Sequence, residues 1–183
     1  MILETDRLRL RPWEETDAPS LYECAKDPRV GPAAGWSAHP DAEHSLNTIR
    51  KFLSSEGTFA ITLKDNGIAI GAVGLSFRST SKIDIGDDEA NVGYWIGVPF
   101  WNRGLVTEAV HELMRYAFED LGISVLWCGY FDGNERSKRV QEKCGFRYHH
   151  TEYDKERYEI GMTVTEHISR ITKEEWSLRD AQF

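Results

Sequence analysis

The sequence has little cysteine, no long hydrophobic run and no excess of basic residues, and each shortage excludes a class of protein. Three cysteines, Cys24, Cys128 and Cys144, stand far apart without CxxC spacing, which argues against disulfides and zinc and for a reducing cytoplasm. The opening MILETDRLRLRPW lacks the apolar core of a signal peptide, and no stretch approaches the roughly 20 apolar residues of a membrane span. A net charge of −8 argues against direct nucleic-acid binding, which requires a basic face. We therefore expect a cytoplasmic protein that binds neither membranes nor nucleic acids.

The remaining composition is typical of a globular protein. Hydrophobic residues make up 40% and charged residues 28% of the 183 residues, which is enough for one domain with a buried core. The sequence has no internal repeat and no low-complexity linker. These features predict a single domain over residues 1–183.

Hydrophobic periodicity predicts an α/β domain with a mixed sheet. Residues 31–40 hold two prolines and two glycines and are expected to form a loop, whereas Asn66-Gly67 indicates a hairpin turn. The helices predicted between strands at 98–124 and 131–146 have the pattern of crossovers. The predicted strands cover 7–11, 58–63, 68–77, 90–98, 124–131, 146–153 and 157–168, and the predicted helices cover 14–26, 41–55, 105–121 and 134–143.

The stretch from Val98 to Thr107 joins a hydrophobic strand to the most regular predicted helix. Pro99 cannot donate a strand hydrogen bond, so the strand is expected to end there. The amides from about Asn102 to Thr107 precede the helical hydrogen bonds, and Gly104 has no side chain to keep an anion away. With the helix dipole and Arg103, this stretch is a candidate phosphate site. The alternative is a tightly packed helix start without a ligand, and the sequence has neither G-x-G-x-x-G nor a P-loop.

This stretch resembles motif A of the GCN5-related N-acetyltransferases, the GNAT family. The opening of the sequence and Glu174-Glu175-Trp176 are similar to the branch that acetylates ribosomal-protein N-termini, the RimJ/RimL type. The family's Q/R-x-x-G-x-G/A loop falls on Trp101 to Val106, and both end residues depart from that pattern. The resemblance implies a mixed, largely antiparallel sheet flanked by helices. It rests on Gly93-Tyr94-Trp95-Ile96-Gly97, Pro99-Phe100-Trp101-Asn102-Arg103-Gly104, Thr107-Glu108-Ala109, Asn134-Glu135-Arg136-Ser137 and Glu142-Lys143-Cys144-Gly145-Phe146.

The resemblance also implies acetyl-CoA as the co-substrate, with its pyrophosphate at the hinge. The strand before the hinge would pair through its backbone with the pantetheine arm, and Asn134 would hold the same arm. The residues implied for acetyl-CoA binding are Trp95, Ile96, Gly97, Val98, Trp101, Asn102, Arg103, Gly104, Leu105, Val106, Thr107, Asn134 and Ser137.

Acetyl transfer from a thioester to an amine needs a neutral amine, a donor to the oxyanion and a proton for the leaving thiolate. A backbone amide near Ile96 or Gly97 is the candidate oxyanion donor. Many members carry a tyrosine acid where this sequence has Gln141, which cannot supply an acidic proton. The resemblance therefore implies Ser137 as the acid, with Asn134 beside it. The alternatives are a simple helix cap and an ordinary helix hydroxyl.

The base is less evident, because relatives often carry a glutamate where this sequence has Asn91. Glu89 shares a strand face with Asn91 and is the candidate base or amine anchor, although it also reads as a solvated loop charge, like Asp87 and Asp88. Roughly a tenth of an α-amine is neutral at pH 7, against under about one part in a thousand of a lysine amine. A chain without a strong base therefore favours an N-terminal α-amine as acceptor.

The predicted acceptor-binding residues are Trp36, Asn91 and Tyr94, and His39 and His44 also lie near the expected acceptor side. The adjacent histidines at 149 and 150 would point to opposite faces of a strand, so no metal site is predicted.

Three functions fit these patterns. The first is an acetyl-CoA-dependent N-acetyltransferase that acts on a peptide N-terminus or a small primary amine by direct transfer in a ternary complex. The second is a non-catalytic CoA-binding or regulatory module of the same fold, and the third, a nucleotide enzyme, lacks the expected phosphate loops. The exposed final strands are compatible with a homodimer.

Overall fold

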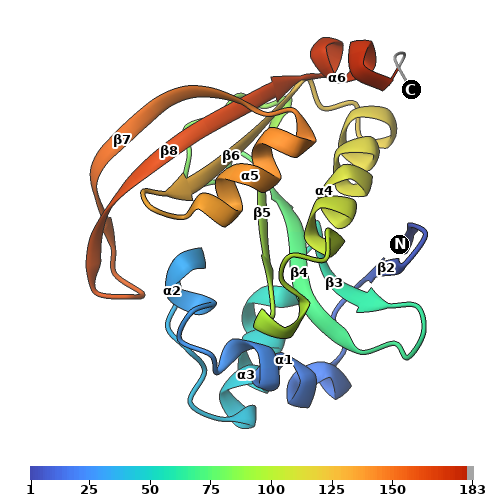
Figure 1. Ribbon diagram of the computed structural model, residues 1–183, viewed down its shortest axis with the longest axis vertical. Coiled ribbons are helices and arrows are strands. Elements are labelled where there is room, and N and C mark those ends of the chain that lie inside the picture. The colour runs from blue at the N-terminus through green and yellow to red at the C-terminus, as the bar shows by residue number, and fades with distance from the viewer. Residues whose placement is uncertain (181–183) are drawn as a thin grey trace.

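The computed structural model describes residues 1–180 and is built on one eight-stranded sheet in the order β1-β2-β3-β4-β5-β6-β8-β7 (Figure 1). Residues 181–183, which the single-domain prediction includes, lie outside the described part. Neighbouring strands are antiparallel except β5 and β6, which confirms the mixed, largely antiparallel sheet. The strands are β1 (Leu3–Glu4), β2 (Leu8–Arg11), β3 (Thr58–Leu63), β4 (Ala69–Ser76), β5 (Glu89–Ile96), β6 (Val125–Phe131), β7 (Arg147–Arg157) and β8 (Met162–Thr172).

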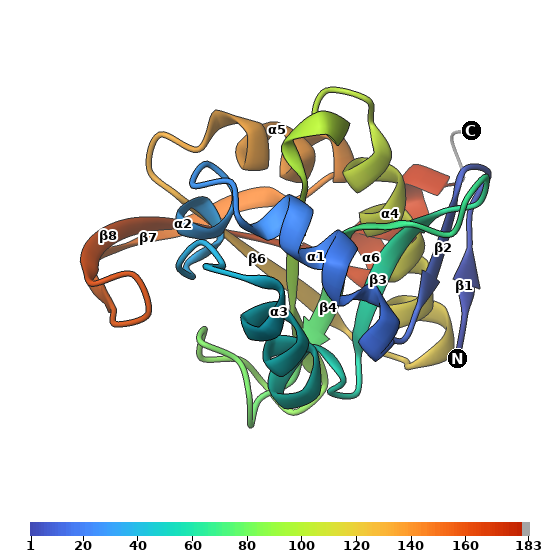
Figure 2. The same ribbon diagram turned by 90° about the horizontal axis from the view of Figure 1, so that it is seen from below.

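Helices cover both faces of this sheet (Figure 2). A 3-10 turn at Glu15–Asp17 leads into α1, and another at Val98–Phe100 follows β5. π-Helical turns at Ile49–Leu53 and Tyr116–Asp120 extend α3 and α4. The α-helices are α1 (Ala18–Ala25), α2 (Gly31–Ala34), α3 (Ala42–Thr48), α4 (Leu105–Arg115), α5 (Glu135–Cys144) and α6 (Lys173–Asp180).

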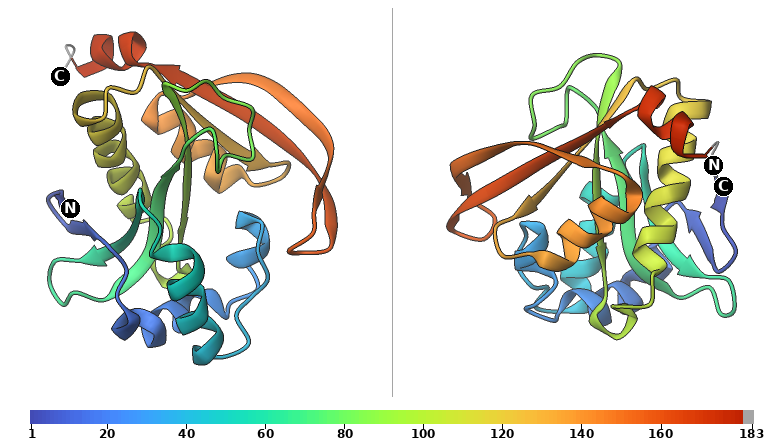
Figure 3. Two further views of the ribbon diagram at one scale, coloured as in Figure 1. Left: turned by 180° about the vertical axis from the view of Figure 1, so that it is seen from behind. Right: turned by 45° about the horizontal axis from the view of Figure 1, so that its top comes forward.

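The main core lies between the sheet and the layer of α4 and α5, which the right panel of Figure 3 shows in front. The apolar stripe of α4 drives this packing, because Ala109, Val110 and Leu113 are fully buried against the strands. From the sheet, alternate residues of β5 (Ala90, Val92) point into this core, so the intervening residues point to the opposite face.

The opposite face is covered in two places. Trp13, Leu21 and Ile49 bury small residues of β3 and β4 beneath α1 and α3. The β4–β5 connection covers β6 and β8, where Ile83 packs on Ile168. Between these two covers the face is open, and the site described below lies there.

Most predicted elements are confirmed with shifted ends, and β3 coincides with its prediction. The loop predicted over 31–40 is wrong for Gly31–Ala34, which form the short helix α2 that ends at Gly35 (φ 87°). The helix predicted over 41–55 ends in the π-helical turn Ile49–Leu53, where Ile49 is buried and Phe52 is 67% exposed. The short elements β1 and α6 have no counterpart among the predictions.

Candidate active site

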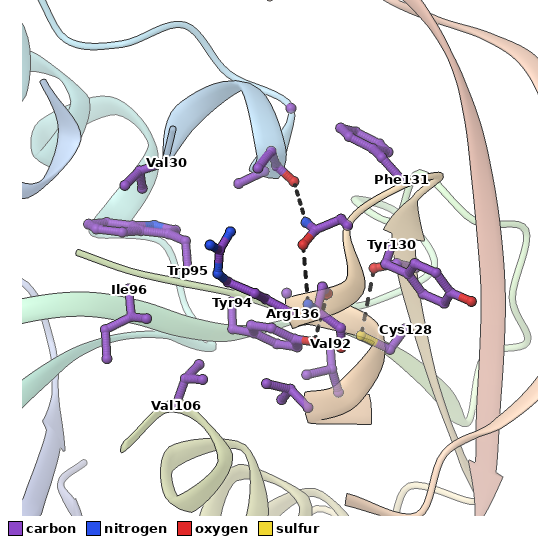
Figure 4. Close-up of a pocket in the computed structure, with 18 of the residues that line it drawn as sticks. Val30, Val92, Tyr94, Trp95, Ile96, Val106, Cys128, Tyr130, Phe131 and Arg136 are labelled. Carbon is purple, nitrogen blue, oxygen red and sulfur yellow. Dashed lines mark hydrogen bonds between the residues drawn. The ribbon is translucent and has the colours of Figure 1, made fainter. Parts of the chain in front are cut away.

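The site begins where the two parallel strands separate. β5 and β6 pair only from Glu89 to Asn91 and from Val125 to Trp127, and beyond these residues β5 stays with β4 while β6 follows β8. A cavity of about 680 Å³ fills the opening, within the usual range for small-molecule sites (Figure 4). Its walls come from both strands, the start of α4, one side of α5 and α2.

The open edge of β5 presents backbone groups to this cavity. The Gly97 amide donates to the Ile70 carbonyl of β4 at 2.8 Å. Successive amides of a strand point in opposite directions, so the Ile96 amide points away from β4, toward the gap. Of the two predicted oxyanion donors, Ile96 therefore has the suitable direction.

The hinge after β5 places the first turn of α4 at the cavity. Gly104 adopts a left-handed conformation (φ 73°), as does Asn102 (φ 59°), and the chain turns sharply into the helix. The first helical hydrogen bond runs from the Glu108 amide to the Gly104 carbonyl at 3.0 Å. The amides of Leu105–Thr107 precede it, and these three residues line the cavity. This arrangement suits an anion.

Trp101 holds the hinge against β5, and arginine side chains lie over its ring. Its indole Nε1 donates to the Ile96 carbonyl at 2.9 Å, which ties the loop back to β5. The Arg136 guanidinium of α5 lies 4.2 Å from the Trp101 ring centre, and Arg29 lies over the same ring at 5.8 Å. Both arginines line the cavity, so positive charge stands near the amides of α4.

Asn134 caps α5 and orders the chain around Ser137. The Asn134 side-chain Oδ1 accepts a hydrogen bond from the Ser137 amide at 3.2 Å, while its Nδ2 donates to the Ala33 carbonyl of α2 at 3.4 Å. Asn134 is thus a helix cap, which the sequence analysis gave as the alternative, and it also lines the cavity and links α5 to α2.

The Tyr94 hydroxyl meets Ser137 inside the cavity wall. It donates to the Ser137 carbonyl at 3.0 Å and lies 2.9 Å from Ser137 Oγ. Burial raises the pKa of the Tyr94 phenol well above its ordinary value, with the neighbouring Cys128 thiol acting in the same direction. The phenol therefore stays protonated and serves as a hydrogen-bonding partner of Ser137.

Gln141 is 2% exposed, and its Nε2 donates to the Gly129 carbonyl of β6 at 3.1 Å. Within the described residues its Oε1 is buried without a hydrogen-bond partner. The side chain thus joins α5 to β6 one turn beyond Ser137 and supplies no acidic proton.

Five residues predicted for the site are outside the cavity lining in the structure. Gly97 packs against Cys24, where a Cβ would lie 2.6 Å from the sulfur, and the Arg103 guanidinium lies over the Phe100 ring. Their roles stay predictions. The five are Trp36, Glu89, Gly97, Val98 and Arg103, whereas Asn91, Tyr94, Trp95, Ile96, Trp101, Asn102, Gly104, Leu105, Val106, Thr107, Asn134 and Ser137 line the cavity.

The Glu89 carboxylate is committed to local structure. Its Oε2 accepts the Gly86 amide at 2.9 Å and the Trp127 indole at 2.8 Å, so it ties the β4–β5 connection to β6. Its role as a base stays a prediction.

His39 also serves the scaffold. Its Nδ1 lies 2.8 Å from Ser45 Oγ, and its ring contacts Trp36, which in turn packs edge-on against Trp95. Burial, with a smaller effect of His44, lowers the pKa of His39 to about 4, so the ring is neutral at pH 7.

Two groups of lining residues were missed by the sequence reasoning. One is the basic stripe of α5, Arg136, Arg139 and Lys143, whose helical spacing is a signal that could have been found. The other is the buried ion pair of Arg157 and Glu166, which depends on strand pairing and gives no local signal.

The comparisons with known proteins decide the family. The model of the acetyltransferase (GNAT) domain matches residues 7–147, most of the chain. The chain belongs to the GNAT acetyltransferase family. Acetyltransferases of this family take the acetyl group from acetyl-CoA, which confirms the predicted class of enzyme.

Relatives of this GNAT chain agree in sequence and in fold. The "Putative ribosomal N-acetyltransferase YdaF" of Bacillus subtilis is 37% identical over 149 residues, covering 77% of this chain and 78% of that protein. A GNAT-family acetyltransferase from Bacillus anthracis has a TM-score of 0.82 at 21% identity, covering 96% and 100% of the chains. The ribosomal-protein-S5-alanine acetyltransferase of Vibrio fischeri has a TM-score of 0.74 at 16% identity, covering 96% and 98%.

The cavity of this GNAT chain fits the chemistry of acetyl-CoA. The phosphates need amide and cationic donors, which the first turn of α4 and the basic stripe of α5 provide. Across residues 1–180 the structure has no group of three or more histidine, cysteine or acidic side chains placed to hold a metal ion. Within the same range, no helix is both long and apolar enough to cross a bilayer.

Proposed function

We propose that this chain transfers the acetyl group of acetyl-CoA to a primary amine, and that the preferred acceptor is the N-terminal α-amine of a peptide or protein. The observation that carries the proposal is the opening between β5 and β6, where a hydroxyl pair and an amide-rich helix start share one cavity. Two relatives named for ribosomal acetylation support a protein N-terminus as acceptor.

Transfer is direct in this proposal, with both substrates bound together. The amine nitrogen attacks the thioester carbonyl, and the resulting oxyanion accepts a hydrogen bond from the Ile96 amide at the open edge of β5. The tetrahedral intermediate then breaks its C–S bond, and the thiolate takes a proton from Ser137 Oγ. A preorganised oxyanion donor accounts for about 10² to 10³ in rate, and a placed acid for about 10² to 10⁴.

The phosphates bind at the start of α4. The amides of Leu105–Thr107, Gly104 with its free approach and the cations of α5 face this part of the cavity. The pantetheine arm pairs with the open edge of β5, and Asn134 borders it from the opposite wall.

An acceptor screen tests the proposal. The purified chain is incubated with acetyl-CoA and with peptide N-termini, polyamines, aminoglycosides or free amino acids, while thiol release and product mass are followed. We expect thiol release with α-amine acceptors and a loss of at least about 10² in Ser137→Ala. Reaction confined to polyamines or aminoglycosides would refute the α-amine preference. Tight CoA binding without thiol release for any amine would indicate the non-catalytic module.

A further inference from the structure

On the side of the sheet turned away from α4 and α5, two glycines line the floor of the cavity. Gly93 of β5 and Gly129 of β6 both line it. A Cβ built on Gly93 would meet no atom within 4 Å, so this glycine leaves a hollow. A Cβ on Gly129 would lie 2.4 Å from Glu166 Oε1, so this glycine makes room for a carboxylate. Both glycines sit where β5 and β6 separate.

The Glu166 carboxylate is buried beside this floor. It stands on β8 opposite Phe131 of β6, and its Oε2 accepts a hydrogen bond from Arg157 Nη2. Both side chains line the cavity at 9% exposure. Arg157 also lies over the Phe131 ring, 5.7 Å from its centre. The ion pair is therefore held in one place by packing on two sides.

The surroundings of Glu166 make its carboxylate more ready to take up a proton. Burial raises its pKa, and the attraction of Arg157 opposes this rise without cancelling it. Glu152 and Lys155 of β7 are the further charged groups that act on it, in opposite directions. On β6, the Cys128 thiol stays protonated because burial raises its pKa.

A buried acceptor without a partner among the described residues also faces this cavity. Asn91 projects from β5 on the same side as Gly93, two residues away. Its Oδ1 is buried and has no hydrogen-bond partner among residues 1–180. A buried amide oxygen and a buried carboxylate that line one cavity match a ligand that donates several N–H groups, as a protonated primary amine does.

We propose that Glu166, held by Arg157 against Gly129, receives the acceptor's ammonium group and takes its proton, with Asn91 Oδ1 as the second hydrogen-bond acceptor. This inference rests on the proposed acetyl transfer to an amine. It assigns the proton acceptor to β8 rather than to Glu89, whose carboxylate is bound to Gly86 and Trp127 outside the cavity lining.

The proton balance of the reaction is complete with these groups. The ammonium loses one proton to the Glu166 carboxylate and attacks as the neutral amine, forming the C–N bond. The nitrogen is then positively charged and loses its second proton as the C–S bond breaks. Ser137 gives its hydroxyl proton to the departing thiolate and then takes the second proton of the nitrogen. Glu166 returns its own proton to solvent.

The test compares Glu166→Gln with Glu156→Gln, which neutralises an exposed carboxylate on the same strand ribbon outside the cavity. The measured quantities are kcat/KM with a peptide acceptor from pH 6 to pH 9 and the Kd of acetyl-CoA. At pH 7 we expect Glu166→Gln to lose about 10²-fold in kcat/KM, because a placed base contributes about that much. The loss should shrink toward pH 9, where the α-amine is largely neutral in solution. The Kd of acetyl-CoA should not change.

Gly129→Ala is the second variant, because it keeps the carboxylate but forces it off its position. If Glu166→Gln shows no cooperative thermal transition, Gly129→Ala and Glu166→Asp decide. Each should lose activity at pH 7 while retaining affinity for acetyl-CoA. Wild-type activity in these variants, or a pH-dependent loss in Glu89→Gln instead, would overturn the assignment. A wild-type chain that binds no acetyl-CoA and acetylates no amine would refute the proposed function itself.

Discussion

The contact between Tyr94 and Ser137 is the smallest unit of the site with a testable consequence. Ser137 Oγ lies 2.9 Å from the phenol oxygen, and the phenol also donates to the Ser137 carbonyl at 3.0 Å. Tyr94 thus fixes both the main chain and the side chain of Ser137. Tyr94 lies on the same side of β5 as Val92, toward α4 and α5, and its predicted role in acceptor binding stays a prediction.

We predict that Tyr94→Phe lowers kcat about fivefold, because losing one buried hydrogen bond costs roughly 1 kcal/mol and frees the serine hydroxyl to rotate. The KM for acetyl-CoA should change little. Steady-state kinetics would show this, with Tyr148→Phe as the control, since it removes an exposed hydroxyl that is hydrogen-bonded to Thr151. If Tyr94 acts through Ser137, Tyr94→Phe adds nothing to Ser137→Ala. Additive losses in the double variant would contradict this role.

At the scale of elements, α5 carries charge along the face that borders the cavity. Arg136, Arg139 and Lys143 follow one another at spacings of three and four residues, so they share a helix face. Lys138 lies on another face and borders a separate hollow with Tyr130 and His167. The charge of −8 for the whole chain conceals this local excess of positive charge.

We predict that Arg136→Ala and Arg139→Ala each raise the Kd of acetyl-CoA about fivefold, which corresponds to ~1 kcal/mol for an exposed ionic contact. The effect should weaken at high salt, because exposed charges are screened. Binding of S-acetylpantetheine, which lacks phosphates, should be unaffected. Isothermal titration at two salt concentrations measures all three, with Lys138→Ala as the matched control. Equal losses for both ligands would mean that the arginines do not act on the phosphates.

Elements with a local pattern could be predicted, and those defined by pairing could not. β3 and the Asn66-Gly67 turn follow from alternation and turn chemistry, and Gly104 marks the start of α4 where the structure has it. The proposed acetyl-CoA side of the site follows from these signals. α2 was missed because Gly31 and Pro32 read as helix breakers, although a proline is tolerated in the first turn of a helix.

At the scale of the molecule, the proposed acceptor side of the site depends on strand order. Gly129 and Glu166 are 37 residues apart, and they meet because β8 inserts between β6 and β7. Glu166 also needs Arg157 from the far end of the β7–β8 ribbon, whose turn is tied to the β4–β5 connection by an ion pair between Lys82 and Glu159 at 3.0 Å. The hydrophobic periodicity of one segment carries no information about contacts between residues on different strands.

The sheet has two parts that share little hydrogen bonding, since β5 and β6 pair over three residues only. A ligand in the opening contacts both parts, so it should strengthen their association as well as bind. At a concentration 100 times its Kd, CoA should add about 2.7 kcal/mol to the free energy of unfolding, which raises Tm by roughly 5–10 °C for a chain of this size.

We therefore predict that CoA raises Tm by this amount and slows amide hydrogen exchange in both 92–96 and 128–131. Differential scanning fluorimetry and exchange mass spectrometry measure the two effects. Adenosine 3′,5′-bisphosphate is the control, because it lacks the pantetheine arm that would lie between the strands. It should raise Tm less and leave 128–131 unprotected, since it reaches only the α4 and α5 end. Protection by CoA confined to the start of α4, with β6 unchanged, would mean that the arm does not lie in the opening between the two strands.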